Sequence, residues 1–283
     1  MNAANRSGAG NGELGQLPGP LMLIGAGKMG GALLDGWLNF GFDPAGIVVI
    51  EPQPTPAISG LVARGLQLNP NAAALTKAAG VVIAVKPQAA AEALATAAPF
   101  IAASTVVVSI MAGRTIQSLG QGLAHGCALV RAMPNLPAAI GRGITVAVAR
   151  DAKPEQRRLA DRLLSATGPV EWIEDEALMD AVTAVSGSGP AYVFLLAEAL
   201  AHAGVQAGLP PKLAEKLARV TVSGAGELLH QGNVDAASLR ENVTSPGGTT
   251  AAALAVLMGP NGLAPLMTRA VAAATDRSRQ LAR

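Results

Sequence analysis

The sequence predicts an α/β domain with a doubly wound parallel sheet, followed by an all-helical domain. Short runs rich in valine and isoleucine alternate with helical stretches from residue 20 to about 150, a pattern typical of βα units. A glycine-rich turn follows the first of these runs, and no convincing strand remains beyond Glu174. The 283 residues are enough for two domains that each bury a core.

The strand candidates are short and apolar throughout, as expected for strands covered on both faces. They are LMLIG (21–25), GIVVIE (46–51), GVVIAV (80–85), TVVVSIM (105–111), CALVRAM (127–133) and ITVAVA (144–149). Helical stretches such as GGALLDGWLNF (30–40) and AAAEALATAAPFI (89–101) separate most of them. A helix over 153–167 and a short connecting strand in GPVEWIE (168–174) complete this domain, which we expect to span residues 20–173.

The second domain, expected over residues 174–283, consists of helices. We predict them at 175–184, 190–204, 210–231, 235–241, 249–258 and 262–282. Pro190, Pro210 and Pro211 fall where helices start, which suits a residue with a fixed φ and no amide donor.

The most apolar segment of the chain is AYVFLLAEALAHAG (191–204), which nevertheless carries Glu198 and His202. A bilayer span needs about 18 consecutive apolar residues, and no uncharged run reaches that length. We therefore expect a buried helix here and no membrane span.

Composition argues against several kinds of partner. The net charge is +2 with no basic run, and aromatic residues make up 2% of the chain, so nucleic-acid binding is disfavoured.

The single cysteine, Cys127, cannot form an internal disulfide, and we expect a buried thiol in a cytoplasmic protein. His125, His202 and His230 lack the spacing of metal ligands, so no metal site is expected. Residues 1–19 are glycine-rich without an apolar core, which predicts a mobile tail and not a signal peptide.

The turn Gly25-Ala26-Gly27-Lys28-Met29-Gly30 has the G-x-G-x-x-G spacing between a predicted strand and a predicted helix. Gly25 allows a tight turn, Gly27 lets the backbone approach a pyrophosphate, and Gly30 lets helix and strand pack closely. The start of the helix adds free amides and a positive dipole end. We therefore predict a Rossmann-like domain that binds a dinucleotide; a purely structural glycine turn is the alternative.

Charged residues follow two of the later strands. Glu51 ends the second strand, where a carboxylate accepts hydrogen bonds from the adenosine ribose and repels a 2′-phosphate. The nearest arginine, Arg64, is a whole helix away, so the sequence favours NADH over NADPH. Lys86 and Pro87 end another strand, at the edge where ligands of open α/β sheets bind. A solvated glutamate and an exposed loop lysine are the alternatives.

The stretch SPGGTT (245–250) places two glycines and two threonines before a predicted helix, with no ionisable group among them. Uncovered amides beside Gly247 and Gly248 can hold a small carboxylate. A plain helix cap is the alternative.

The stretch SGSGPAY (186–192) lacks the G-x-S-x-G spacing of a serine hydrolase. We expect Ser188 and Gly189 to cap the helix that Pro190 begins. Tyr192 is expected to pack in the core and not to donate a proton.

Six stretches together resemble the pyrroline-5-carboxylate reductase family in order and spacing. They are IGAGKMGGALLDGWL, AVKPQ, VVSIMAG, RAMPNLPAAIGRGIT, VSGSGPAYVF and ENVTSPGGTTAAAL. The resemblance covers nearly everything from residue 20 to 280, and RAMPN, SGSGPAY and SPGGTT are far more specific than the glycine turn. It implies reduction of 1-pyrroline-5-carboxylate to L-proline with NAD(P)H, the last step of proline biosynthesis.

The resemblance also implies site residues and an assembly. Gly25 through Gly30 would cradle the pyrophosphate, and the nicotinamide side would be lined by Val85, Lys86, Pro87, Ile110, Met111 and Ala112. Asn242 would reach the cofactor, and the substrate would be held by Gly247, Gly248, Thr249 and Thr250. The helical domain would interleave with a second subunit, giving a homodimer or a larger homo-oligomer. Many family members have a hydroxyl residue where Glu51 stands and use NADPH, so Glu51 departs from the pattern.

Hydride transfer to a protonated imine is mainly a positioning task, with the two carbons about 3–3.5 Å apart. Thr250 is the predicted catalytic residue, because its hydroxyl can hydrogen-bond the imine nitrogen or relay a proton to it. A β-hydroxyacid dehydrogenase, the closest rival, needs a lysine on the interdomain helix, and none lies between Lys153 and Lys212. A second rival is a non-catalytic sensor that binds NADH without consuming it.

Overall fold

The computed structural model describes residues 17–121, 123, 126–232 and 234–281, which form two compact units. The first unit runs through Val182 and is rejoined by the chain at Ser278, and the second comprises Thr183–Arg277. The mobile tail expected over residues 1–19 lies almost wholly outside the described residues. The expected boundary between a cofactor-binding domain and a substrate-binding domain at residues 173/174 stays a prediction. The two compact units of the structure meet at a different place in the sequence, after Val182.

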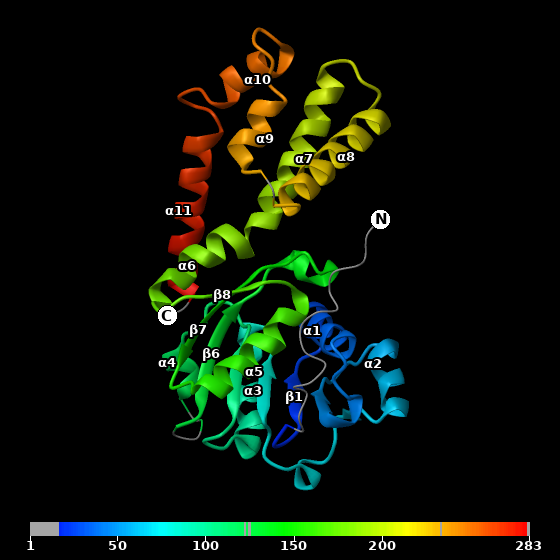
Figure 1. Cartoon of the computed structure of the whole chain (residues 1–283), viewed down its shortest axis with the longest axis vertical. Helices are drawn as coiled ribbons and strands as arrows, with labels where there is room; N and C mark the ends of the chain where they lie inside the picture. Colours follow the sequence, from blue (N-terminus) through cyan, green and yellow to red (C-terminus); the bar gives the residue numbers. More distant parts are fainter. Residues whose placement is uncertain (1–16, 122, 124–125, 233, 282–283) are drawn as a thin grey trace. The chain divides into compact units, whose positions relative to one another are not determined.

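The first unit is built on a sheet whose strands follow the order β3-β2-β1-β4-β5-β6-β7-β8 (Figure 1). The strands are β1 Leu21–Ile24, β2 Ile47–Ile50, β3 Gln67–Leu68, β4 Gly80–Ile83, β5 Val106–Ser109, β6 Ala128–Met133, β7 Thr145–Arg150 and β8 Val170–Trp172. The chain starts in the middle of the sheet at β1, winds outward through β2 and β3, and returns to build the other half from β4. This confirms the predicted doubly wound α/β class.

Two features of the sheet differ from the expectation. Strand β7 runs antiparallel to β6, with Ala132 opposite Ala147, whereas a wholly parallel sheet was expected. The connection from β6 to β7 contains only the 3-10 turn Leu136–Ile140, and a parallel crossover requires a dozen or more residues, usually with a helix. Strand β3 was not predicted, because two residues are too short for a recognisable pattern.

Helices cover both faces of the sheet and bury alternate residues of each strand. Helices α1 (Lys28–Asn39), α2 (Pro56–Gly60) and α5 (Pro154–Leu164) pack on the face that carries Leu21 and Leu23. Helices α3 (Ala90–Ala97) and α4 (Ile116–Gly120) pack on the face that carries Met22 and Ile24. Cover on both faces explains why the strands are apolar at every position.

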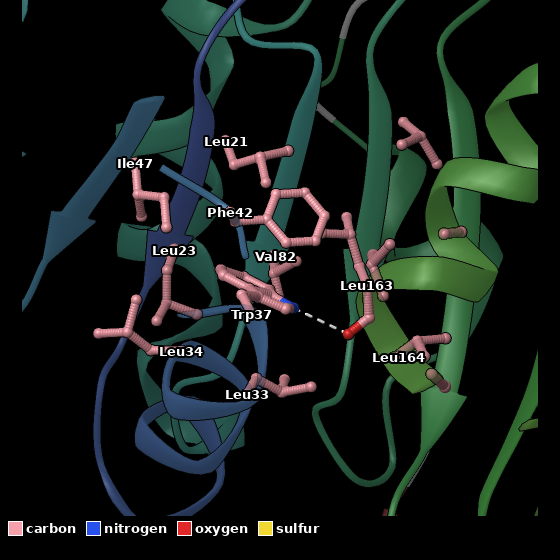
Figure 2. Close-up of a cluster of buried hydrophobic side chains, with 14 of the residues drawn as sticks. Leu21, Leu23, Leu33, Leu34, Trp37, Phe42, Ile47, Val82, Leu163 and Leu164 are labelled. Carbon is pink, nitrogen blue, oxygen red and sulfur yellow. Dashed lines mark hydrogen bonds between the residues drawn. The ribbon is translucent and has the colours of Figure 1, made fainter. Parts of the chain in front are cut away.

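Trp37 fixes α1 against α5 (Figure 2). Its indole is completely buried, and Nε1 donates a hydrogen bond of 2.8 Å to the carbonyl of Leu163. That carbonyl lies in the last turn of α5, where it has no partner within the helix. The indole therefore supplies both apolar area and the hydrogen bond that the helix end lacks.

The second unit is helical, as predicted. Its helices are α7 Gly189–Gln206, α8 Pro211–His230, α9 Ala236–Asn242, α10 Thr249–Leu257 and the greater part of α11 Leu263–Leu281. Figure 1 shows α7 and α8 side by side as a helical hairpin. Pro190 and Pro211 stand in the first turns of α7 and α8, as expected.

The predicted helix at 175–184 is divided into several elements. It begins as the 3-10 turn Glu176–Leu178, continues as α6 (Met179–Val182) and widens into a π-helical turn over Thr183–Gly187. Ser188 occupies the N-cap position of α7 but has helical backbone angles and makes no side-chain capping hydrogen bond. The expected N-cap position of Ser188 is therefore confirmed, but its side chain does not cap the helix. Its amide donates to the carbonyl of Thr183 at 2.9 Å, so the π turn runs directly into α7.

The expected burial of segment 191–204 is wrong for the single chain. Helix α7 has no buried residue, and Phe194 and Leu195 are 60% and 62% exposed. By length and composition alone, the stretch Glu176–Gln206 is also long and apolar enough to cross a membrane: an 18-residue window in it has a mean hydropathy of 1.3, and 6% of that window is buried. The apolar composition of α7 showed that other protein must pack against this helix. Within the single chain that packing is only partial and comes chiefly from α8.

Candidate active site

The glycine turn joins β1 to α1, and each of its three glycines occupies a distinct environment. Gly25 has φ +88°, and a Cβ there would lie 2.8 Å from the carbonyl oxygen of Ala84. A Cβ on Gly30 would run into the carbonyl oxygen of Gly25, so α1 approaches the turn closely. Gly27 is exposed, with no atom within 4 Å of where a Cβ would stand.

The start of α1 presents main-chain amides to an anion. The amide of Gly31 donates to Gly27 at 2.7 Å and is the first to bond within the helix. The preceding amides, of Lys28, Met29 and Gly30, have no carbonyl within the helix to accept from them. Gly27 leaves the approach open, and the turn therefore fits a dinucleotide pyrophosphate.

The carboxylate of Glu51 lies against the same turn. Oε2 accepts a hydrogen bond from the amide of Ala26 at 2.7 Å, and Oε1 accepts from the amide of Gln53 at 3.0 Å. A carboxylate has about four acceptor sites, so this one retains capacity for two ribose hydroxyls. The tip of β2 and the glycine turn thus form one continuous surface.

A cavity of about 350 Å³ unites several of the predicted residues. Its lining includes Gly25, Gly27, Glu51, Val85 and Lys86, which come from the ends of three adjacent parallel strands. Ala89, which immediately precedes α3, and Glu92, Ala93 and Thr96 of α3 complete the lining, and the sequence reasoning missed them. Their only signal was that α3 directly follows the strand-end motif AVKPQ.

A second hollow, of about 780 Å³, is lined in part by Gly27, Lys28, Thr55 and Arg64. Sequence separation suggested that Arg64 was remote from the glycine turn. The structure instead has Arg64 and Lys28 lining the same hollow, because α2 and the short turn after it fold back toward α1. Two cationic side chains therefore lie within one hollow beside the turn.

The loops after β4 and β5 lie at the same edge of the sheet, since these strands are parallel. Arg114 ties the two loops together through a 3.0 Å hydrogen bond from its guanidinium to the carbonyl of Pro87. Ile110 is half-buried and Ala112 is exposed. The side chain of Met111 is buried in the core, so only its main chain can face a cofactor.

In the helical unit, the turn SPGGTT leads into α10. Gly247 has φ +70°, and Gly248 is the N-cap residue, whose carbonyl accepts from Ala252 at 3.2 Å. The amides of Thr249, Thr250 and Ala251 precede that first helical bond and have no carbonyl within the helix to accept from them. No side chain caps them, so they form an anion-binding surface of the same kind as the first turn of α1. Asn242 is the exposed last residue of α9, in the same unit.

The remaining candidates have structural roles. Tyr192 is half-buried, and its hydroxyl donates to the carbonyl of Ala184 at 3.0 Å, which ties α7 to the π turn. Cys127 is buried as predicted, and burial raises the pKa of its thiol. Over the part of the chain that the structure describes, no three His, Cys, Asp or Glu side chains gather as metal ligands. The absence of a metal site stays a prediction.

A doubly wound sheet, an open glycine turn and an acidic residue at the tip of the second strand define a class, the nicotinamide-dinucleotide oxidoreductases. Residues 20–113 match the family model described as "NADP oxidoreductase coenzyme F420-dependent". Residues 176–281 match the model described as "Pyrroline-5-carboxylate reductase dimerisation". The chain belongs to the pyrroline-5-carboxylate reductase family.

Similar sequences and structures agree with this assignment. Pyrroline-5-carboxylate reductase from Pseudomonas aeruginosa is 39% identical, over 93% of this chain and 96% of that protein. The reductase from Synechocystis is 40% identical, over 92% and 97%. A pyrroline-5-carboxylate reductase structure from Coxiella burnetii matches with a TM-score of 0.85 and 32% identity, over 94% of this chain and 99% of that one. The Plasmodium falciparum enzyme, solved with NADP bound, matches with a TM-score of 0.77 and 28% identity, over 95% and 100%.

Proposed function

We propose that this chain reduces 1-pyrroline-5-carboxylate to L-proline by hydride transfer from NAD(P)H, the last step of proline biosynthesis. The observation that carries this function is 39% identity to a pyrroline-5-carboxylate reductase over 93% of the chain. The open glycine turn and the uncapped start of α10 give that reaction the two anion-binding surfaces it needs, one for the cofactor and one for the imino acid.

The cofactor is assigned to the cavity at the carboxyl ends of the strands. The amides of Lys28, Met29 and Gly30 would hold the pyrophosphate, and Glu51 would accept from the adenosine ribose. The loops at Val85–Pro87 and Ile110–Ala112 would flank the nicotinamide, with Met111 contributing only its main chain. When bound, the reduced nicotinamide supplies the hydride.

The substrate is assigned to the turn Gly247–Thr250. A carboxylate there accepts hydrogen bonds from the amides of Thr249 and Thr250, and the open space beside Gly247, where a Cβ would meet no atom within 4 Å, leaves room for it. Asn242, in the same unit, is assigned a contact with the cofactor. Because hydride transfer needs carbon atoms about 3–3.5 Å apart, the proposal requires this turn, from the same chain or a second copy, to meet the nicotinamide.

Thr250 is the proposed catalytic residue. Its hydroxyl accepts a hydrogen bond from the N–H of a protonated imine, or relays a proton to the nitrogen of an unprotonated one as hydride addition turns the C=N bond into C–N. A threonine hydroxyl is a weak acid, so it serves best with a substrate that is already protonated or with a water that completes the relay. The lack of ionisable groups in the turn is consistent with a reaction that depends mainly on positioning.

NADH is the proposed preferred cofactor. The Glu51 carboxylate would lie beside the ribose, where it accepts from a 2′-hydroxyl and repels a 2′-phosphate. Lys28 and Arg64, which line the neighbouring hollow, would partly offset that repulsion and keep NADPH usable.

A homodimer or larger homo-oligomer is the proposed assembly. Large apolar side chains of α7, α8, α10 and α11 are exposed in the single chain, among them Phe194, Leu217, Val256 and Leu266. Patches of this kind mark protein interfaces, and residues 176–281 match a dimerisation model. A reducing cytoplasm is the proposed location, consistent with a single, buried and unpaired cysteine.

The decisive experiment mixes purified protein with pyrroline-5-carboxylate and either NADH or NADPH, and follows the loss of nicotinamide absorbance. Imine-dependent oxidation, faster with NADH, is the expected result. A β-hydroxyacid dehydrogenase would instead require a hydroxy acid and oxidised cofactor, and a sensor would bind NADH without oxidising it. Either of those results would overturn the proposed function.

A further inference from the structure

Asn69 lies beside the carboxyl end of β2 and forms hydrogen bonds with Val49 of that strand and with Glu51, the residue that follows it. It follows β3, whose Leu68 is paired with Val49, and its amide extends the ladder by donating to the carbonyl of Val49 at 2.8 Å. The backbone then turns away with φ +46°, a left-handed conformation that asparagine tolerates better than most residues. The chain therefore leaves the sheet here, while the side chain still faces β2.

The side-chain amide of Asn69 pairs with both main-chain groups of Glu51. Oδ1 accepts from the amide of Glu51 at 2.8 Å, and Nδ2 donates to its carbonyl at 2.8 Å. In a longer sheet, the main chain of a neighbouring strand would form these two hydrogen bonds. Here the side-chain amide of Asn69 takes the place of that main chain just beyond the end of β3. The backbone of Glu51 is thereby fixed one residue beyond the end of β2 (Ile47–Ile50).

This fixed backbone determines where the Glu51 carboxylate can lie. From that position the carboxylate reaches the amide of Ala26 at 2.7 Å, inside the glycine turn. Glu51 lines the cavity of about 350 Å³, whereas Asn69 lines a separate hollow with Ile50. Asn69 does not line the cavity itself, and its hydrogen bonds to the cavity lining are the two with Glu51.

We propose that Asn69 is the positioning residue for cofactor selection: it holds the Glu51 carboxylate where it accepts from a 2′-hydroxyl and repels a 2′-phosphate. This inference rests on the proposed contact between Glu51 and the ribose. Without the side-chain amide, the tip of β2 can move and the carboxylate leaves the position in which it discriminates. Discrimination between the two cofactors then falls, while the fold, which the apolar core determines, persists.

The test measures Kd for NADH and for NADPH by titration calorimetry, without turnover, in the wild type and two variants. Asn69→Gly keeps the left-handed backbone and removes both side-chain hydrogen bonds. Asn69→Asp keeps the acceptor for the Glu51 amide but places a carboxylate against the Glu51 carbonyl, and it serves if the glycine variant does not fold. In each, the ratio of the two Kd values is expected to shift toward NADPH by about fivefold.

Two controls separate positioning from a general loss of structure. Asp43→Ala removes a comparable side-chain to main-chain hydrogen bond, 3.0 Å to Ala45, just before the start of β2, and it should leave the Kd ratio unchanged. In a Glu51→Ser background, Asn69→Gly should change the ratio by less than about twofold, because the residue it positions is gone.

An unchanged ratio in both Asn69 variants would overturn the proposal while leaving the reductase function standing. The same shift with and without Glu51 would overturn it too, since Asn69 would then act by another route. An unchanged Kd ratio in the single variant Glu51→Ser would show that Glu51 does not contact the ribose, and the proposal for Asn69 would fail with it. Because binding is measured directly, failure of the reductase reaction is a separate observation, made in the turnover assay.

Discussion

Replacing Gly27 with alanine tests the glycine turn without disturbing the fold. Gly27 has φ −67°, within the range of an ordinary residue, and a Cβ there meets no atom within 4 Å. At a helix N-cap, alanine costs about 0.5–1 kcal/mol relative to glycine, and lower entropy of the unfolded chain returns about the same amount. The free energy of unfolding should therefore change by less than about 0.5 kcal/mol.

Cofactor binding should respond very differently to the same methyl group. If the pyrophosphate rests on the backbone at Gly27, the methyl occupies its contact surface, and such overpacking typically costs about 1–3 kcal/mol. The Kd for NADH should therefore rise roughly 5- to 150-fold.

The assay pairs urea unfolding with titration calorimetry, and Gly46→Ala is the matched control. Gly46 is also exposed, with no atom within 4 Å of its Cβ position, but it ends the 3-10 turn Pro44–Gly46 just before β2, away from the glycine turn. The control should alter neither stability nor affinity. If the Gly27 variant binds NADH as tightly as the wild type, the pyrophosphate does not lie on this turn and the assignment fails.

Three further predictions concern catalysis, an acid-sensitive helix cap and the core. Thr250→Val should lower kcat for the imine by roughly a hundredfold while the Kd for NADH stays unchanged; normal turnover would remove Thr250 from the mechanism. Asp235 caps α9, and the hydrogen bonds from the Ser238 amide, then the Ser238 hydroxyl and the Ala237 amide, hold the pKa of its carboxyl below the usual 3.8. The stability that this cap contributes is therefore fully present above that value and is lost as the pH falls through the lowered pKa. Asp235→Ala should be less stable than wild type near neutral pH, and the difference in free energy of unfolding between the two should narrow in acid. A difference independent of pH would contradict this. Trp37→Phe should lower the free energy of unfolding by about 2–4 kcal/mol in a denaturant titration, because it leaves a cavity and an unpaired Leu163 carbonyl; a change below about 0.5 kcal/mol would show that the core closes around the loss.

Much of the fold follows from local patterns in the sequence. Strands covered on both faces are apolar almost throughout, so β1, β2, β4, β5 and β6 were visible as short apolar runs. Prolines marked the starts of α7 and α8. The direction of β7 was not visible, since the apolar pattern of a strand is the same whichever way it runs and only the short connection before it decides the pairing.

The features that were missed depend on contacts between distant parts of the chain or on a second molecule. Arg64 lines a hollow with Lys28 although thirty-odd residues separate them in sequence. The pairing of Asn69 with Glu51 depends on one left-handed residue at the end of a two-residue strand, which leaves no periodic signal. The apolar character of α7 was clear, but the sequence does not say whether its own chain or a partner covers it.

Main-chain amides at Gly247–Thr250 are the proposed binding site for the carboxylate of the imino acid. The most direct measurement is a crystal structure of the chain with L-proline and NAD bound. We expect the carboxylate oxygens of proline to lie about 2.7–3.2 Å from the amide nitrogens of Thr249 and Thr250, with the ring facing the nicotinamide. Proline bound elsewhere, with those amides facing only solvent, would contradict the account.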